Sequence, residues 1–222
     1  MERLQDLFQG MRVFAKTESG AVTALNRQGD CWEGPDIHVQ VTIKDCGKAA
    51  AVMVDAVLME GSFHPEDGIR IYLELPDNAE IMADYQHSEY WCRPAFAENP
   101  SAVPDRTQGL VWEKDGAFGY FLPVCGEQYK AVLCGDEKGL FLRMESWFPG
   151  MKECHELVLM AAVGDNPRVL AENCTEIGLS LLPGNFPDRK GRRYPERFEY
   201  LGWCSWDALQ IRVGETGLAE KC

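Results

Sequence analysis

The stretch LVWEKDGAFGYFL (residues 110–122) carries the clearest fold signal in this 222-residue chain. Its two apolar runs, 110–114 and 117–122, flank Asp115-Gly116. Asp-Gly between apolar runs is typical of a type I′ turn, because that turn needs positive φ at both central residues. We therefore expect an antiparallel β-hairpin at this point of the chain.

Further strands are expected on both sides of this hairpin, at residues 37–43, 69–75, 129–134, 139–144 and 156–163. The first two alternate apolar and polar side chains, which is the period-two pattern of a half-buried strand. The third and fourth flank a short turn that contains glycine. Many short strands separated by turns predict a mainly β protein, with a sandwich of stacked antiparallel sheets over residues 1–165.

The pattern changes after the sandwich. Asn166-Pro167 places an N-cap residue before a proline at the first helical position. The apolar residues that follow are four, three and four positions apart: Leu170, Cys174, Ile177 and Leu181. This spacing predicts one face of a helix. Proline, glycine and basic residues come next, so residues 166–197 are expected to be a helix and a linker.

Charge excludes two classes of partner. The chain has 22 lysine and arginine residues against 35 aspartate and glutamate residues, a formal net charge of −13. A nucleic acid or an anionic membrane would repel such a chain, so we expect neither partner. No apolar run reaches the roughly 18 residues of a membrane span. The N-terminus lacks the basic start and apolar stretch of a signal peptide, and we expect a cytoplasmic protein.

The cysteines and histidines do not form a metal-binding pattern. The nine cysteines include no CxxC pair, and the four histidines are scattered through the chain. Zinc sites and disulfide frameworks use close, regular spacings of these residues. We therefore expect no metal site, and reduced thiols that are mostly buried.

The segment FEYLGWCSWD (residues 198–207) is the most informative stretch for function. Trp203 and Trp206 lie three positions apart and Asp207 follows them. An indole offers a flat apolar face to a sugar ring, and a carboxylate accepts hydrogen bonds from ring hydroxyls. The alternative is two core tryptophans and an aspartate that caps a helix. The segment looks like the first βα unit of something larger, because one parallel strand needs neighbours.

Four motifs together resemble the raffinose synthase or seed imbibition protein family, which includes alkaline α-galactosidases and is related to the wider α-galactosidase clan. They are YWCRPAF (residues 90–96), RTQGLVW (106–112), VGDNP (163–167) and YPERFEYLGWCSWDA (194–208). The last resembles the family's barrel-entry motif and is the most specific of the four. The resemblance covers roughly residues 80–222, and the four motifs occur in the same order as in the family.

The resemblance implies an N-terminal β-supersandwich packed against a (β/α)8 barrel that acts on α-galactosides, as a hydrolase or a galactosyl transferase. Retaining enzymes of this kind use two carboxyl groups about 5 Å apart and no metal or cofactor. No acidic residue of this sequence matches the family's catalytic aspartates, which belong to later barrel strands. Residues 198–222 would be the first strand and helix start of a truncated TIM barrel, and we expect the chain alone to be inactive.

Carried over by position, Trp206 would stack on substrate and Asp207 would bind galactose hydroxyls, because barrel active sites lie at the C-terminal ends of the strands. Trp91 and Arg93 are a second candidate pair. They lie in a loop-like stretch (84–100) of the sandwich, and such a loop could contribute residues to the entrance of the barrel's active site. Their alternative is a surface aromatic ring stacked on a guanidinium.

Two other readings of the whole chain stay open. It could be a stand-alone carbohydrate-binding sandwich, or a structural module that forms oligomers. Without barrel partners, Leu201 to Trp206 would expose apolar surface and a strand edge. The tail would then pack on the sandwich, be poorly ordered, or support self-association.

Overall fold

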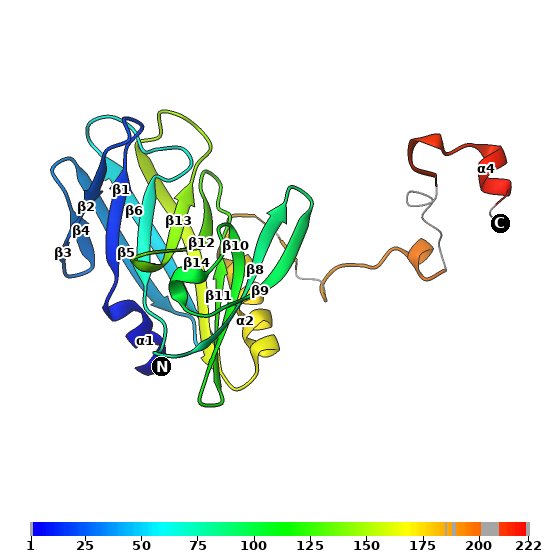
Figure 1. Cartoon of the computed structure of the whole chain (residues 1–222), viewed down its shortest axis with the longest axis horizontal. Coiled ribbons are helices and arrows are strands. Elements are labelled where there is room, and N and C mark those ends of the chain that lie inside the picture. The colour runs from blue at the N-terminus through cyan, green and yellow to red at the C-terminus, as the bar shows by residue number, and fades with distance from the viewer. Residues whose placement is uncertain (1, 185, 188–189, 201–208, 221–222) are drawn as a thin grey trace. The chain divides into compact units, whose positions relative to one another are not determined.

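The computed structural model describes residues 2–184, 186–187, 190–200 and 209–220. The chain divides into two units, Met1–Phe186 and Pro187–Cys222, which are described separately. The first unit is mainly β and holds all the strands of the described residues (Figure 1).

The strands are β1 (Arg12–Lys16), β2 (Val22–Ala24), β3 (Asn26–Gln28), β4 (Cys31–Glu33), β5 (Ile37–Asp45), β6 (Ala50–Leu58), β7 (Ile69–Leu73), β8 (Glu80–Ser88), β9 (Trp91–Ala97), β10 (Thr107–Lys114), β11 (Ala117–Pro123), β12 (Lys130–Asp136), β13 (Gly139–Glu145) and β14 (Glu153–Gly164). The helices of this unit are α1 (Glu2–Gln9) and α2 (Pro167–Leu181), with a 3-10 turn, η1 (Pro100–Ala102).

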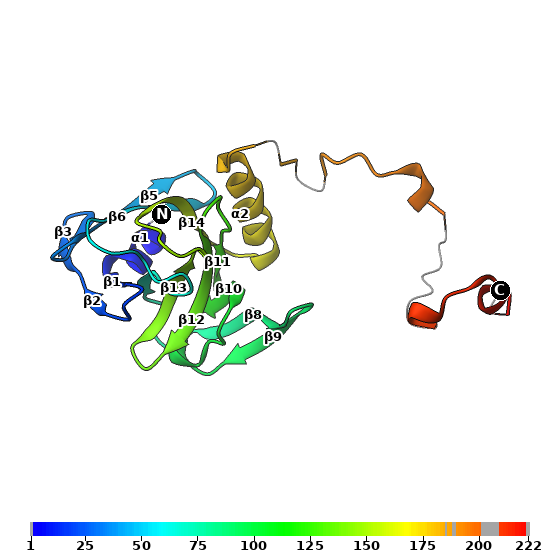
Figure 2. The same cartoon turned by 90° about the horizontal axis from the view of Figure 1, so that it is seen from above.

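The strands form two layers of one antiparallel sheet. The first layer runs β2-β1-β7-β13-β12, and the second runs β9-β8-β10-β11-β14-β6-β5-β4-β3. Between β10 and β12 the structure records one paired position, Thr107 with Leu133, and this pair joins the layers. The strands at the two ends, β2 and β3, are consecutive in the chain, so the sheet nearly closes (Figure 2). The expected stacked sheets are thus one continuous sheet folded over itself.

The hairpin at residues 110–122 is confirmed. β10 and β11 are paired from Leu110 with Phe121 to Lys114 with Ala117. Asp115 and Gly116 have φ of 52° and 78°, as a type I′ turn requires. All five other expected strands also occur, within one to three residues of their predicted ends. The expected loop at 84–100 is wrong, since most of it forms the β8–β9 hairpin.

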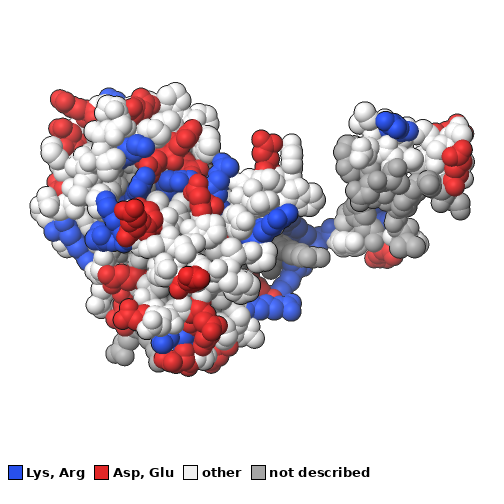
Figure 3. Space-filling view, in the orientation of Figure 1, with Lys and Arg blue, Asp and Glu red and all other residues white. Residues whose placement is uncertain are grey.

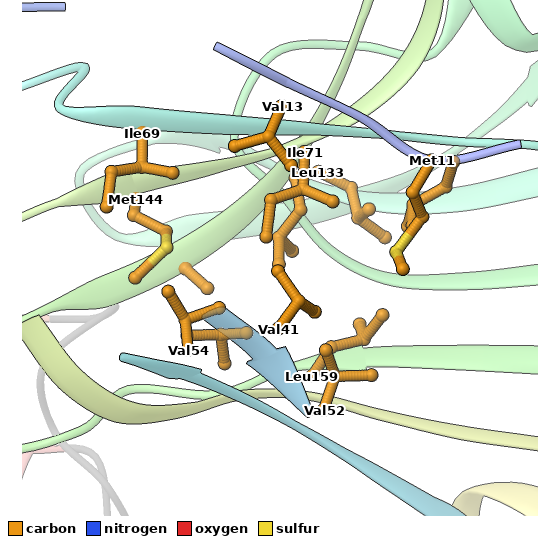
Figure 4. Close-up of a cluster of buried hydrophobic side chains, with 14 of the residues drawn as sticks. Met11, Val13, Val41, Val52, Val54, Ile69, Ile71, Leu133, Met144 and Leu159 are labelled. Carbon is orange, nitrogen blue, oxygen red and sulfur yellow. The ribbon is translucent and has the colours of Figure 1, made fainter. Parts of the chain in front are cut away.

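Apolar side chains of both layers fill a common core (Figure 4). Those from β1, β7, β12 and β13 face those from β5, β6 and β14, and the set includes Val13, Ile69, Ile71, Leu133, Met144, Val41, Val52, Val54 and Leu159. Burial of such side chains stabilises a fold by about 25 cal/mol per Å² of apolar surface. The N-terminal stretch was expected to belong to an all-strand domain but forms the helix α1. Leu7 and Phe8 of this helix join the core.

The predicted helix is confirmed as α2. Its N-cap Asn166 accepts hydrogen bonds from the backbone N–H groups of Arg168 and Val169, at 3.0 and 3.3 Å. Leu170 and Cys174 are buried against Met160 and its neighbours on the outer face of β14. The helix therefore covers the side of the second layer that faces away from the core (Figure 2).

The second unit contains short elements in its described part. They are η2 (Glu196–Phe198), η3 (Gln210–Arg212) and α4 (Glu215–Ala219). The expected barrel strand falls mainly on residues 201–208, which lie outside the described residues. In the described part of the chain no helix is long and apolar enough to cross a membrane.

Candidate functional site

Two regions of the first unit present chemically useful side chains at the surface. One is β9, which carries the predicted Trp91 and Arg93. The other is a polar cavity around Trp147, here called the Trp147 pocket. The other predicted residues, Trp206 and Asp207, lie outside the described residues, as does the expected apolar tail from Leu201 to Trp206.

β9 is the last strand of the second layer and pairs only with β8. Its opposite edge is free within the described chain, and the β8–β9 hairpin projects from the layers (Figures 1 and 2). Trp91 is 67% exposed and Phe96 is 84% exposed, with Tyr90 beside them also exposed. An exposed strand edge with apolar side chains is typical of a contact surface.

Trp91 and Arg93 occupy the same strand but do not form the stacked pair that was one alternative. Among the described residues, the recorded cation–π contacts involve other cations. Both side chains are exposed and lie two residues apart on β9, so both are available to a partner or a ligand.

The Trp147 pocket has a volume of about 440 Å³. Its walls come from the end of β1, the β6–β7 connection, the segment before β10, and β13 with the residues after it. The residues that matter are Lys16, Asp67, Asp105, Arg106, Arg143, Glu145 and Trp147. Figure 3 shows lysine, arginine and carboxylate side chains interspersed on one face of this unit.

Glu145 organises one wall of the pocket. Its carboxylate is 1% exposed and accepts hydrogen bonds from Arg143 Nε at 2.8 Å and from Trp147 Nε1 at 3.0 Å. A buried carboxylate costs free energy unless it is paired in this way. The backbone N–H of Trp147 also donates to the Pro65 carbonyl, at 2.9 Å. These two hydrogen bonds fix the position of Trp147, while the residue remains 52% exposed.

Arg143 links Glu145 to a second carboxylate. Its Nη1 lies 2.9 Å from Asp105 Oδ1, which also accepts a hydrogen bond from the thiol of Cys134 at 3.0 Å. Burial alone would raise the pKa of Asp105, but the Cys134 thiol and the Arg143 charge outweigh it and lower that pKa. Burial also raises the pKa of the Cys134 thiol to about 12, so the thiol stays protonated and acts as a donor.

A second ion pair forms the opposite wall. Asp67 accepts hydrogen bonds from Arg70 Nε at 2.7 Å and Nη2 at 2.6 Å, and from Lys16 Nζ at 3.4 Å. The hydrogen bonds to Asp67 are the largest cause of a raised pKa at Arg70. A carboxylate has about four acceptor positions, so those that the cations leave open can bind hydroxyl groups.

Two residues at the mouth of the pocket have unusual backbone geometry. Arg106 and Trp147 both have φ of 59°, in the left-handed region. The Arg106 guanidinium carbon lies 5.7 Å from the centre of the Trp147 ring. A bulky residue is uncommon in this region and costs free energy there, and such positions cluster at functional sites.

Sequence reasoning missed the Trp147 pocket. Its residues come from segments between positions 16 and 147, which only the folded sheet brings together. A local signal did exist, because Trp147 follows the alternating polar residues Arg143 and Glu145 and precedes Pro149-Gly150. In the described part of the chain, no cluster of three or more His, Cys, Asp or Glu side chains is arranged to hold a metal ion.

Comparison with known proteins identifies the family. The profile described as "Raffinose synthase or seed imbibition protein Sip1" matches residues 71–221. The probable galactinol–sucrose galactosyltransferase 1 of Arabidopsis thaliana is 26% identical over 151 residues, 62% of this chain and 20% of that protein. The probable galactinol–sucrose galactosyltransferase 6 is 25% identical over 207 residues, 83% of this chain and 26% of that protein.

The chain thus spans about a fifth to a quarter of the length of these curated relatives. The profile match runs from β7 through α2 and into the second unit, and so includes both units. Because it extends over well over half of the sequence, this chain belongs to the raffinose synthase or seed imbibition protein Sip1 family.

Proposed function

We propose that this chain is the N-terminal, non-catalytic portion of an enzyme that transfers or hydrolyses α-galactosyl groups. The profile match over residues 71–221 carries the proposal. The names of the two relatives support galactosyl transfer between galactinol and sucrose as the reaction class. In this proposal residues 198–222 are the first strand and helix start of a (β/α)8 barrel.

The chemistry of the Trp147 pocket supports a non-catalytic role for the β unit. Retaining galactosyl transfer needs two carboxyl groups about 5 Å apart, one of them with a raised pKa so that it can donate a proton. In the pocket, Glu145 and Asp67 are held by arginines, and the pKa of Asp105 is lowered. Asp105 is therefore a poor proton donor, and Glu145 and Asp67 are engaged as hydrogen-bond acceptors.

The site roles follow from the same proposal. Trp206 stacks on the galactosyl ring and Asp207 accepts hydrogen bonds from its hydroxyls. Trp91 and Arg93 are proposed as further substrate-contact residues, which their exposure on β9 supports. A cytoplasmic location belongs to the proposal too, supported by free thiols at all seven described cysteines.

The test compares two lengths of the same protein. The purified 222-residue chain is incubated with galactinol and sucrose, and with a chromogenic α-galactoside, and we expect neither transfer nor hydrolysis. A longer polypeptide from the same gene, comparable in length to the relatives, should be active. In it, Asp207→Asn should raise the KM for galactinol about tenfold or more, because the galactose hydroxyls lose their hydrogen bond to a charged carboxylate.

Two results would contradict the proposal. Turnover of either substrate by the 222-residue chain would show that the β unit contains a reacting centre. An active longer polypeptide in which Asp207→Asn and Trp206→Ala change nothing would remove these two residues from the substrate site.

A further inference from the structure

We propose that the Trp147 pocket is a second binding site, separate from any catalytic centre, and that it takes a neutral saccharide. The inference goes beyond the proposed function, because it needs no catalysis and no residue outside the first unit. It is carried by the cavity, the fixed indole and the pattern of paired charges.

The pocket has the form of a small-molecule site. Its volume of about 440 Å³ lies within the range of roughly 300–1,000 Å³ that such sites occupy. Trp147 is held at its Nε1 by Glu145, so its ring has a defined orientation and half of the residue faces solvent. The Arg106 guanidinium carbon lies over the ring at 5.7 Å from its centre, farther than the cations of Phe14, Tyr72 and Phe141 lie from their rings, and the residue is still 52% exposed. The exposed part of the indole provides a flat apolar surface for the C–H side of a sugar ring.

The backbone at Trp147 points to a role other than packing. Its φ of 59° is a conformation in which glycine would be free of steric cost, whereas an ordinary side chain costs about 1–2 kcal/mol. Only about half of the residue is buried. Its placement instead brings an aromatic face to the mouth of a polar cavity, with Arg106 near the ring.

The charges favour a neutral ligand over an ion. Besides Trp147, the lining has three lysine or arginine side chains, four carboxylates and one histidine: Lys16, Arg106, Arg143, Glu66, Asp67, Asp105, Glu145 and His64. An anion would meet a slight excess of carboxylates. A cation would have to compete with arginines that already hold Asp67, Asp105 and Glu145.

The paired groups can still bind hydroxyls. An ionised carboxylate has about four acceptor positions and a lysine ammonium has three donors. Lys16 Nζ has one recorded hydrogen bond, to Asp67, and it faces the same cavity as Trp147. Hydroxyl groups can donate to the carboxylate oxygens and accept from the ammonium. Polar groups on one side and an apolar ring on the other match the two faces of a saccharide.

The experiment is a titration of the 222-residue chain with raffinose, with methyl α-D-galactopyranoside and, separately, with inorganic phosphate. Binding is followed by the indole N–H resonance of Trp147 in a nitrogen-15 NMR spectrum. We expect a saturable shift with either saccharide, at a dissociation constant on the order of 1 mM, and none with phosphate.

Trp147→Gly is the informative variant, because glycine accepts the left-handed φ and the backbone is not strained by the change. The fold should persist in the NMR spectrum while the saccharide affinity, followed by the neighbouring backbone amides, falls at least about tenfold. Lys16→Gln should weaken binding as well. Phe186→Ala, at an aromatic residue that is about as exposed as Trp147 but does not line the pocket, is the matched control and should leave binding unchanged.

The proposal is overturned if neither saccharide shifts the Trp147 resonance, if phosphate shifts it and the saccharides do not, or if Trp147→Gly binds as the unchanged chain does. Loss of binding in Phe186→Ala would also overturn it, because that residue does not line the pocket. None of these outcomes depends on galactosyl transfer, so the proposed function is tested independently.

Discussion

Two aromatic surfaces on the outside of the first unit differ in how they are covered. On the first layer, Phe14, Tyr72 and Phe141 form a cluster, here called the covered cluster. Each ring lies under a cation: Lys138 Nζ is 4.7 Å from the Phe14 ring centre, and the guanidinium carbons of Arg12 and Arg70 are 4.7 and 5.0 Å from Tyr72 and Phe141. At β9, Trp91 and Phe96 on the strand and Tyr90 in the turn before it are exposed.

The covered cluster is shielded from solvent within this chain, whereas the aromatic residues at β9 are exposed. A long basic side chain covers an aromatic ring with its apolar stem and keeps its charge in water, so the covered cluster needs nothing further. Tyr90, Trp91 and Phe96 have no such cover among the cation–π contacts of the described residues, and Trp91 and Phe96 lie on a strand with a free edge. We conclude that the covered cluster is complete within this chain and that the exposed surface at β9 is suited to contact with another part of a protein.

The largest expected effect contrasts two phenylalanines. Phe121 is fully buried in the core and Phe96 is exposed on β9. Phe121→Ala should lower the free energy of unfolding by about 3–5 kcal/mol, because it removes buried surface and leaves a cavity. Phe96→Ala should change it by less than about 0.5 kcal/mol. Chemical denaturation of both variants measures the difference.

Equal losses in the two variants would break the comparison. They would mean that Phe96 is buried in the purified chain, either by a second copy or by another segment. Repeating the denaturation at several protein concentrations separates these cases, because only self-association makes the stability depend on concentration.

A smaller effect is expected within the covered cluster. The hydroxyl of Tyr72 donates a 2.6 Å hydrogen bond to Asp136, and burial, followed by this bond, raises the Tyr72 pKa. Tyr72→Phe should therefore cost about 1 kcal/mol of unfolding free energy. Tyr90→Phe, the matched change in the turn before β9, should cost nothing measurable. A cost at Tyr90 as large as that at Tyr72 would contradict the distinction between the two surfaces.

The smallest effect concerns an exposed ion pair, His155 with Asp55. His155 Nδ1 lies 2.9 Å from Asp55, and this hydrogen bond, with the charges of Asp55 and Glu153, raises the His155 pKa above 6.5. The stabilisation is therefore fully present below pH 6.5 and is lost as the pH rises through the folded-state pKa. His155→Gln should cost a few tenths of a kcal/mol at pH 5.5, as exposed pairs do, and nothing at pH 9. A constant difference across this range would contradict the assignment.

Local signals predicted the parts of the fold that depend on neighbouring residues. Asp115-Gly116 determines the hairpin turn, and Asn166-Pro167 determines the start of α2. The helix α1 was missed although its spacing was informative, since Leu4, Leu7 and Phe8 lie on one face and pack against the core. Because the residues after it carry strong strand patterns, residues 2–9 were assigned to the sandwich as well.

The rest could not be predicted because it depends on distant segments. β9 is exposed on both faces and contains Pro94, so it lacks the alternation that marks a half-buried strand. The Trp147 pocket needs Lys16, Asp67 and Arg143 to meet, and only the register of β1, β7 and β13 brings them together. The resemblance in the barrel-entry motif predicted the family, although the residues that carry it lie mostly outside the described chain.

Amide hydrogen exchange of the purified 222-residue chain tests the central claim most directly, by comparing β9 with β14. β14 is flanked by β11 and β6 and is buried over most of its length, whereas β9 has one neighbour and an exposed surface. The account predicts exchange at least about a hundredfold faster in β9 than in β14. Equal protection of the two strands would show that β9 is already covered in this chain, and would contradict its role as an open contact surface.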